Sequence, residues 1–265
     1  MGEIVWLGRY PVKSMLGESV TEAELDESGV VGDRRYALID AESGLVASAK
    51  YPRKWRALLT IRARHDGLIT LPGGVVVSAD DPDADSVLSR AVGRPVRLVR
   101  GRPEDATIER LTPPTEPRPG TVTLGALATG TPGDSFVDFA AVHLVTTATL
   151  DALAREHPGG SVDARRFRPN VVLRMYDDIP FVENTWRHVV MGGVEVTVVA
   201  PTPRCVVPTL AQGDDLSDDP DVLRTAASLN RVPVLNLGRL TCVGVYGSVR
   251  RAGRLRVGDL VRVFA

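Results

Sequence analysis

The segment 201–209 contains the most chemically distinctive residues of this sequence. It places the thiol of Cys205 directly after the guanidinium of Arg204, among prolines at 201, 203 and 208. A neighbouring cation lowers the pKa of a thiol, and the resulting thiolate is both a nucleophile and a soft metal ligand. Because proline fixes φ and cannot donate to a strand ladder, we expect a stiff irregular loop after the apolar run 194–199. From these nine residues alone, a buried and inert cysteine is an equal alternative.

Three further polar clusters lie beside predicted strands. They are Lys13-Ser14, Asp33-Arg34-Arg35 and the run from Arg165 to Asn170. Lys13 stands out, because only three of the 32 basic residues are lysines. If the fold brings these cations together, they suit an anionic ligand, since arginine binds phosphate in a bidentate fork and lysine binds it as a point charge. Each cluster alone is more typical of a solvated surface, and spacing does not decide between the two interpretations.

Composition limits the class of protein. The chain has 265 residues, 43% of them hydrophobic and 25% charged, and a net charge of −1. These values are typical of a soluble globular protein. The net charge is too small to create a strong overall electrostatic field that would attract nucleic acid or a membrane surface. Two cysteines cannot build a disulfide framework or an iron–sulfur cluster, and no apolar run is long enough to span a bilayer. Without a signal-peptide pattern at the start, we expect a cytoplasmic location and no membrane span.

Short apolar runs separated by turn signals predict a mainly β fold with a few helices. We expect strands at 58–64 and 171–175, a hairpin around Gly192-Gly193, and helices at 83–92, 148–156 and 221–229. The proline-rich segment 101–135 predicts a long irregular connection. It divides the chain into an N-terminal domain, 1–115, and a C-terminal domain, 116–265, with a soft boundary inside that segment.

Several motifs, in order along nearly the whole chain, resemble those of the MOSC-domain family. They are 10–14 (YPVKS), 32–39 (GDRRYALI), 143–147 (HLVTT), 166–172 (RFRPNVV), Arg204-Cys205 with Thr209, and Tyr246 before 257–259 (VGD). The resemblance is greatest to the two-part members with an N-terminal MOSC β-barrel, those of the amidoxime-reducing type. It implies an N-terminal MOSC-type β-barrel module followed by a C-terminal MOSC β-barrel domain.

The resemblance also implies a cofactor and a site. Cys205 would be the ligand of molybdenum in a molybdopterin cofactor and the catalytic residue. The implied cofactor-binding residues are Lys13, Ser14, Arg34, Thr146, Thr147, Arg168, Asn170, Arg204, Thr209 and Tyr246. Thr146 and Thr147 would act at a helix start, where free backbone N–H groups attract anions. No pyridoxal phosphate and no intrinsic iron–sulfur cluster are expected.

The leading hypothesis is a molybdenum-dependent oxidoreductase that reduces N-hydroxylated substrates. Its electrons would come from a separate ferredoxin-, flavin- or haem-type partner protein. The alternative is a non-catalytic carrier that delivers the cofactor, or sulfur bound to Cys205. A cysteine hydrolase is a third interpretation, which the flanking prolines disfavour because they remove N–H donors that an oxyanion hole needs. Cys242 is expected in the core, His143 in the core or a pocket wall, and Asp33 as an arginine partner or a turn residue.

Overall fold

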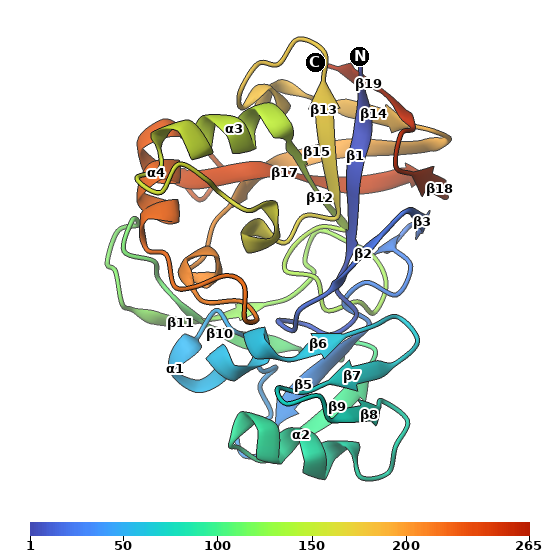
Figure 1. Ribbon diagram of the computed structural model, residues 1–265, viewed down its shortest axis with the longest axis vertical. Coiled ribbons are helices and arrows are strands. Elements are labelled where there is room, and N and C mark those ends of the chain that lie inside the picture. The colour runs from blue at the N-terminus through green and yellow to red at the C-terminus, as the bar shows by residue number, and fades with distance from the viewer.

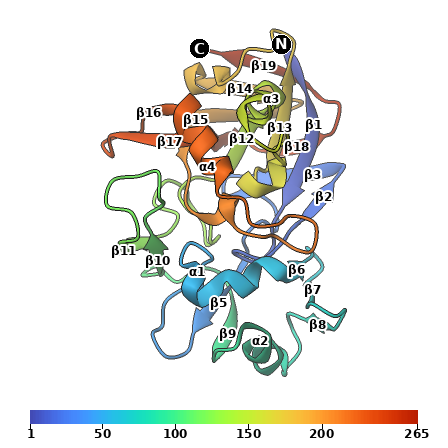
Figure 2. The same cartoon turned by 60° about the vertical axis from the view of Figure 1, so that its left-hand side comes forward.

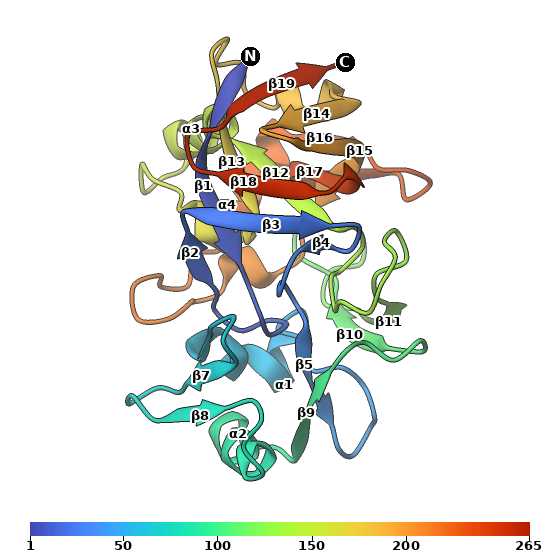
Figure 3. The ribbon, with the colours of Figure 1, turned by 90° about the vertical axis from the view of Figure 1, so that its right-hand side faces the viewer.

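The computed structural model describes residues 1–265 and contains 19 strands, four α-helices and four short 3-10 helices. Figure 1 shows two parts stacked along the long axis, a strand-rich upper part and a lower part with smaller sheets. Both chain ends lie at the far end of the upper part, as Figures 2 and 3 also show. The expected mainly β fold with a few helices is confirmed. None of the helices is both long and apolar enough to cross a membrane.

The upper part is a closed barrel of seven strands, because β12, at one end of the strand path, also pairs with β17. In pairing order the strands are β12 (Val142–Thr146), β13 (Val171–Met175), β1 (Gly2–Arg9), β19 (Leu260–Phe264), β14 (His188–Met191), β15 (Val194–Pro203) and β17 (Arg239–Arg251). All neighbours are antiparallel except β12 and β13. This parallel pair is joined by a crossover through a helix, as parallel strands require.

The barrel encloses the largest apolar core of the protein, a cluster of 20 buried residues. Its closing seam between β12 and β17 depends on glycine. A Cβ at Gly244, where φ is +74°, would lie 2.3 Å from the carbonyl oxygen of Leu144. At this seam the two strands therefore approach more closely than a side chain on Gly244 would allow. Gly247, also in β17, faces the other neighbouring strand β15, where its Cβ would lie 2.3 Å from Val196 Cγ1.

Two helices cover one side of the barrel (Figures 1 and 2). They are α3 (Thr147–Glu156) and α4 (Asp221–Leu229), and they bury an apolar cluster with β12, β13 and β17. Thr146 caps α3, because its side chain accepts a hydrogen bond from the Thr149 backbone N–H. The short elements around the barrel are β2 (Glu18–Val20), β16 (Arg231–Pro233), η2 (Ala164–Phe167), η3 (Val182–Thr185) and η4 (Val207–Thr209).

The lower part has its own core of 14 buried residues. Its elements are β5 (Tyr36–Asp40), α1 (Pro52–Trp55), η1 (Arg56–Thr60), β6 (Arg62–Ala63), β7 (Leu68–Thr70), β8 (Val76–Ser78), α2 (Ala84–Val92) and β9 (Val96–Arg100). Strands β5 and β9 form a two-stranded sheet, and β6, β7 and β8 form a separate three-stranded sheet. As predicted, the helix α2 ends at residue 92, and the next residue, Gly93, takes the left-handed conformation at φ 71°.

The chain does not divide between the two parts at a single point. Strand β1 belongs to the barrel, and β3 (Glu22–Asp26) pairs with β18 (Gly253–Arg256) beside β4 (Gly29–Val30). Figure 3 shows β3 and β18 lying side by side across the barrel. We keep the division into 1–115 and 116–265 as a proposal for two sequence units. Strands β1 and β3 of the first unit pair with strands of the second.

Three expectations about local structure are wrong. Segment 58–64 begins with the last three residues of the 3-10 helix η1, and only Arg62–Ala63 is strand. The connection 101–135 contains a hairpin of β10 (Thr107–Leu111) and β11 (Val122–Ala126). The loop expected from residue 201 begins later, because β15 continues to Pro203. Its pairing with β17 has a register shift between Pro201 and Pro203, and such an irregularity accommodates proline in a strand.

Candidate functional site

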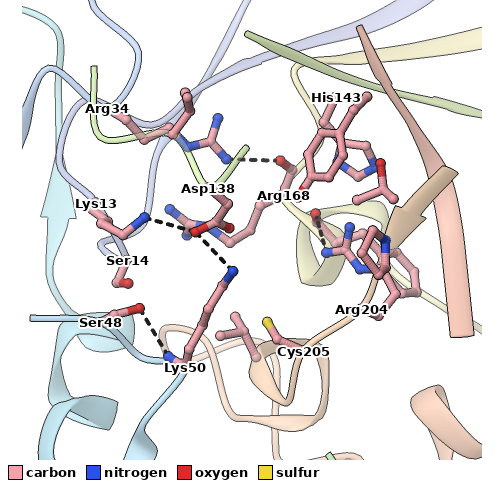
Figure 4. Close-up of a pocket in the computed structure, with 16 residues that line it drawn as sticks. Lys13, Ser14, Arg34, Ser48, Lys50, Asp138, His143, Arg168, Arg204 and Cys205 are labelled. Atoms are coloured by element: carbon pink, nitrogen blue, oxygen red, sulfur yellow. Dashed lines mark hydrogen bonds and ion pairs between the residues drawn. The ribbon is translucent and has the colours of Figure 1, made fainter. Parts of the chain in front are cut away.

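One pocket lies where the lower part, the β11–β12 connection and the barrel meet (Figure 4). Five cationic side chains line it, together with one carboxylate and one thiol. They are Lys13, Arg34, Lys50, Arg168, Arg204, Asp138 and Cys205. The remaining wall is partly aromatic and includes His143, Phe167 and Tyr246. The excess of positive charge indicates a site for an anionic ligand.

Backbone conformation at the pocket is unusual. Eight non-glycine residues of the chain have positive φ, and three of them line this pocket: Ser14 at 64°, Arg34 at 46° and Arg168 at 55°. The left-handed conformation costs free energy for an L-residue and persists where the surroundings enforce it. Strained residues cluster at ligand sites, so this geometry supports a binding function for the pocket.

Lys13, Asp138 and Lys50 form a linked group of charges. Asp138 Oδ1 lies 2.9 Å from Lys13 Nζ and 3.0 Å from Lys50 Nζ. Burial lowers the pKa of Lys13 to about 8, although the charge of Asp138 opposes the shift. Burial alone would raise the pKa of Asp138, but Lys13, Lys50 and Arg110 hold it well below its usual value. Asp138 is therefore ionised at neutral pH.

Arg34 is held by Asp33 on one side and by the barrel on the other. Its guanidinium forms an ion pair with Asp33 Oδ2, and Asp33 Oδ1 accepts a hydrogen bond from the Tyr10 backbone N–H at 2.7 Å. Arg34 also donates to Asn170 Oδ1 at 3.4 Å and to the carbonyl oxygen of Arg168 at 3.3 Å. Asp33 is thus an arginine partner, one of the two roles open from the sequence.

Arg168 differs from Arg34 because no partner satisfies it. Its Nη1 and Nη2 atoms are buried and make no hydrogen bond. Its guanidinium lies 4.3 Å from the centroid of the Tyr10 ring. Burial, and then repulsion from Arg34, lowers the pKa of Arg168 to about 10, which leaves it charged at neutral pH. An unpaired buried cation is costly, so an anion is expected to complete this site.

Cys205 follows β15 and is half-buried, with its sulfur pointing into the open space of the pocket in Figure 4. The preceding Arg204 donates to the carbonyl oxygen of Phe167 at 2.8 Å, and its buried Nε has no partner. His143 lies in the pocket wall, one of its two expected places, with Nε2 3.0 Å from the Val243 carbonyl oxygen. Burial, and then the charge of Arg204, lowers the pKa of His143 to about 3, so it is neutral.

Comparison with known proteins places this architecture in a family. The family model of the MOSC domain matches residues 133–262, and that of the MOSC N-terminal beta barrel domain matches residues 1–92. The chain belongs to the MOSC-domain family. Both matches together take in the barrel and the lower part, and therefore both sides of the pocket. The pocket is accordingly a feature of the two MOSC units together.

Relatives that match nearly the whole chain have about a quarter of their residues in common with it. Mitochondrial amidoxime-reducing component 1 of Mus musculus is 25% identical over 98% of this chain and 82% of its own length. Mitochondrial amidoxime reducing component 2 of Rattus norvegicus is 27% identical over 97% of this chain and 81% of its own length. Among solved structures, the YuaD protein of Bacillus subtilis superposes with a TM-score of 0.46 at 12% identity, covering 99% of this chain and 94% of that protein.

The structure brings most of the predicted MOSC site residues together. The pocket is lined by Lys13, Ser14, Arg34, Arg168, Arg204, Cys205 and Tyr246. Asn170 lies directly behind it, where its side chain accepts from the His143 backbone N–H and donates to the Gly8 carbonyl oxygen. Asn170 therefore helps to orient Arg34 and does not itself line the pocket. The roles of the pocket residues and of Asn170 in ligand binding remain proposals.

Three predicted residues lie elsewhere. Thr146 is fully buried, with Oγ1 3.1 Å from Glu183 Oε2, and neither it nor Thr147 lines the pocket. The sequence suggested a ligand contact there because a helix begins at this point, but a buried carboxylate occupies the helix start instead. Thr209 Oγ1 donates to the carbonyl oxygen of Val206 at 2.7 Å and is also outside the pocket. We drop these three from the proposed site.

Two charged pocket residues were missed from the sequence, Lys50 and Asp138. Asp138 lies just beyond the connection 101–135 that was expected to be irregular, and its contact with Lys13 spans 125 positions. Lys50 carried a weak signal, because it is one of only three lysines. No group of three or more His, Cys, Asp or Glu side chains is placed to hold a metal ion. A metal in this pocket would therefore need ligands from outside the chain.

Proposed function

We propose that this protein is a molybdenum-cofactor oxidoreductase that reduces N-hydroxylated compounds. The observation that carries the proposal is the convergence of Cys205 with five cations in one pocket, among them Arg168 with both Nη atoms unpartnered. The names of the relatives, amidoxime-reducing components at 25–27% identity, support the reaction class.

The residues present fit a phosphorylated, sulfur-coordinated cofactor. The buried unpartnered atoms, Arg168 Nη1 and Nη2 and Arg204 Nε, require acceptors, and phosphate oxygens provide them. A half-buried thiol suits a soft metal that already has sulfur ligands. A molybdenum cofactor bound here would supply the two-electron chemistry that removes oxygen from nitrogen.

The chain itself has three tasks in this proposal. Lys13, Arg34 and Arg168 bind the phosphate, and Cys205 supplies a thiolate to the metal. Neutral His143 and Tyr246 form the wall against a planar ring, with their own ring centroids 6.1 Å apart. Burial raises the pKa of Tyr246, so its hydroxyl stays protonated and can donate a hydrogen bond.

We further propose that the electrons come from a separate protein. The chain has two cysteines, Cys205 and Cys242, and Cys242 is fully buried beside Ala200 and Val234. Four thiolates are needed for a standard iron–sulfur cluster, so these cannot hold one. The alternative role as a carrier of cofactor or sulfur uses the same half-buried Cys205, and only turnover distinguishes the two.

The cysteine hydrolase interpretation has no geometric support. A hydrolase of this type needs a basic imidazole within hydrogen-bond reach of the thiol. No hydrogen bond joins Cys205 to a histidine, and the Nε2 of pocket residue His143 is engaged by the Val243 carbonyl oxygen. With its pKa lowered to about 3, His143 is also a poor base.

The test is turnover with an artificial electron source. Protein produced in a host that makes molybdenum cofactor would be mixed with an aromatic amidoxime and chemically reduced viologen. We expect conversion to the amidine by the wild type and none by Cys205→Ser. A molybdenum-loaded wild type that leaves the amidoxime intact would reject the oxidoreductase and favour the carrier.

A further inference from the structure

A single carboxylate oxygen in the pocket holds two lysines. Asp138 Oδ1 accepts from Lys13 Nζ at 2.9 Å and contacts Lys50 Nζ at 3.0 Å. Figure 4 shows the Lys50 side chain extending across the pocket to reach Asp138, beside the sulfur of Cys205. Two ammonium groups on one carboxylate leave an excess positive charge. An external anion would therefore also be attracted to the place that the Asp138 carboxylate occupies.

The two lysines are held differently. Lys13 is 5% exposed and also donates to the Phe136 carbonyl oxygen at 2.8 Å, so its ammonium is fixed from two sides. The side chain of Lys50 is 12% exposed, and its ammonium has Asp138 as its one partner. Asp138 itself is 34% exposed. Lys50 can therefore change partners by rotating its flexible side chain, whereas Lys13 cannot leave its place without losing a buried hydrogen bond.

We propose that Lys50 is an anion-binding residue of this pocket and that Asp138 is its internal counterion, which an incoming phosphate group replaces. Asp138 keeps Lys50 directed into the pocket while no ligand is present. A phosphate offers more charge and more acceptor oxygens than the carboxylate, and it can accept from Lys50 and from the unpartnered Nη atoms of Arg168 together. The inference deepens the proposed function and rests on the same pocket receiving a phosphorylated ligand.

A neighbouring lysine provides a matched comparison. Lys54 lies four positions further along and is also paired with one carboxylate, Glu109, at 2.9 Å. It is 27% exposed and does not line the pocket. Replacing Lys54 or Lys50 changes the net charge of the chain equally. A difference between the two variants therefore reports the position of the charge and not its amount.

The experiment measures the binding of inorganic pyrophosphate to the full, cofactor-free chain by isothermal titration calorimetry. One ion pair at contact distance in a partly buried site corresponds to a change of about tenfold in affinity. We expect Lys50→Met to weaken binding by about tenfold and Asp138→Asn to strengthen it by at least about threefold. Lys54→Met should stay within about twofold of the wild type.

Several results would overturn the inference. They are no binding of pyrophosphate by the wild type, equal affinities of Lys50→Met and Lys54→Met, or weaker binding by Asp138→Asn. If Asp138→Asn is unstable, the gain in melting temperature on adding pyrophosphate gives the same comparison, and Lys50→Gln serves as a second lysine variant. Because the probe contains no metal, the outcome is separable from the proposed function. A chain that binds pyrophosphate through Lys50 but never holds molybdenum would keep this inference and reject the oxidoreductase.

Discussion

Arg34 and Arg168 lie against the ring of one tyrosine. Their guanidinium carbons are 4.7 Å and 4.3 Å from the ring centroid of Tyr10, and Arg34 donates to the carbonyl oxygen of Arg168. Asp33 neutralises Arg34, whereas no carboxylate pairs with Arg168. Arg168 therefore gives the cofactor-free pocket a buried positive charge without a compensating carboxylate, which favours ligand binding and lowers stability.

Arg168→Met should separate binding from stability. Removing an uncompensated buried charge is expected to raise the free energy of unfolding of the cofactor-free chain by about 1 kcal/mol. The same change should reduce pyrophosphate binding strongly. Urea denaturation and calorimetry measure the two effects, with Arg168→Lys as the variant that keeps the charge. A less stable Arg168→Met protein with unchanged binding would contradict this account.

Anion binding should depend on the protonation of Lys13. Its pKa in the folded chain is about 8, below the ordinary 10.5, so the charge is present at pH 7 and is lost as the pH rises past 8. We expect pyrophosphate affinity to fall by about tenfold between pH 7 and pH 9.5. Lys13→Arg, which stays charged, should give a flatter profile over the same range. Equal pH profiles for the two proteins would show that Lys13 does not contact the anion.

The same shift predicts a pH effect on stability. Between pH 8 and 10.5 the unfolded chain keeps a proton on Lys13 that the folded chain releases, so this residue makes unfolding harder as pH rises through that window. The cost of burying its charge is fully present below pH 8. From pH 8 to 10.5, the unfolding free energy of the wild type should therefore rise relative to that of Lys13→Met. Denaturant titrations at matched pH values measure this difference.

Thr146 and Thr147 should affect the fold and not the cofactor. Thr146→Ala removes the cap of α3 and a hydrogen bond to buried Glu183, so it should lower the free energy of unfolding by about 1–2 kcal/mol. Thr147→Ala should change stability by less than about 0.5 kcal/mol. Molybdenum content per folded chain should match the wild type in both variants. A selective loss of cofactor in Thr147→Ala would restore the contact predicted from the sequence.

Gly244→Ala tests the closing seam of the barrel. Its Cβ would lie 2.3 Å from the Leu144 carbonyl oxygen and 2.6 Å from His143 Nε2, at a φ of +74°. We expect a loss of at least about 2 kcal/mol in unfolding free energy, because both the close contacts and the backbone conformation oppose a side chain. Gly160→Ala is a suitable control, since φ is +68° there and no atom lies within 4 Å of the added Cβ.

Local sequence signals predicted the regular elements well. The strand 171–175 and the helix 221–229 have the predicted ends, since apolar periodicity and adjacent breakers define them. The prediction of a strand at 58–64 was wrong because an apolar run fits a buried 3-10 helix as well as a strand. The hairpin of β10 and β11 was missed, since its prolines and glycines lie mainly in the loop between the strands.

The site could be predicted only in part. Cys205, Lys13, Arg34 and Arg168 were expected from motifs, and the fold does bring them to one pocket. Asp138 was missed, because its role depends on a contact with Lys13 that is 125 positions distant and has no local signature. Thr146 is a different case. A helix start attracts anions in general, but here the buried carboxyl group of Glu183 lies at the helix start.

The most direct test of the central claim is molybdenum and pterin analysis of the purified wild type beside Cys205→Ser and Cys242→Ser. All three proteins would be produced in a host that makes the cofactor. The account predicts nearly equimolar molybdenum and pterin in the wild type and in Cys242→Ser, whose thiol is buried away from the pocket. Cys205→Ser should lose molybdenum or show a changed metal spectrum. A wild type without molybdenum, or a Cys205→Ser protein with unchanged metal content and spectrum, would contradict it.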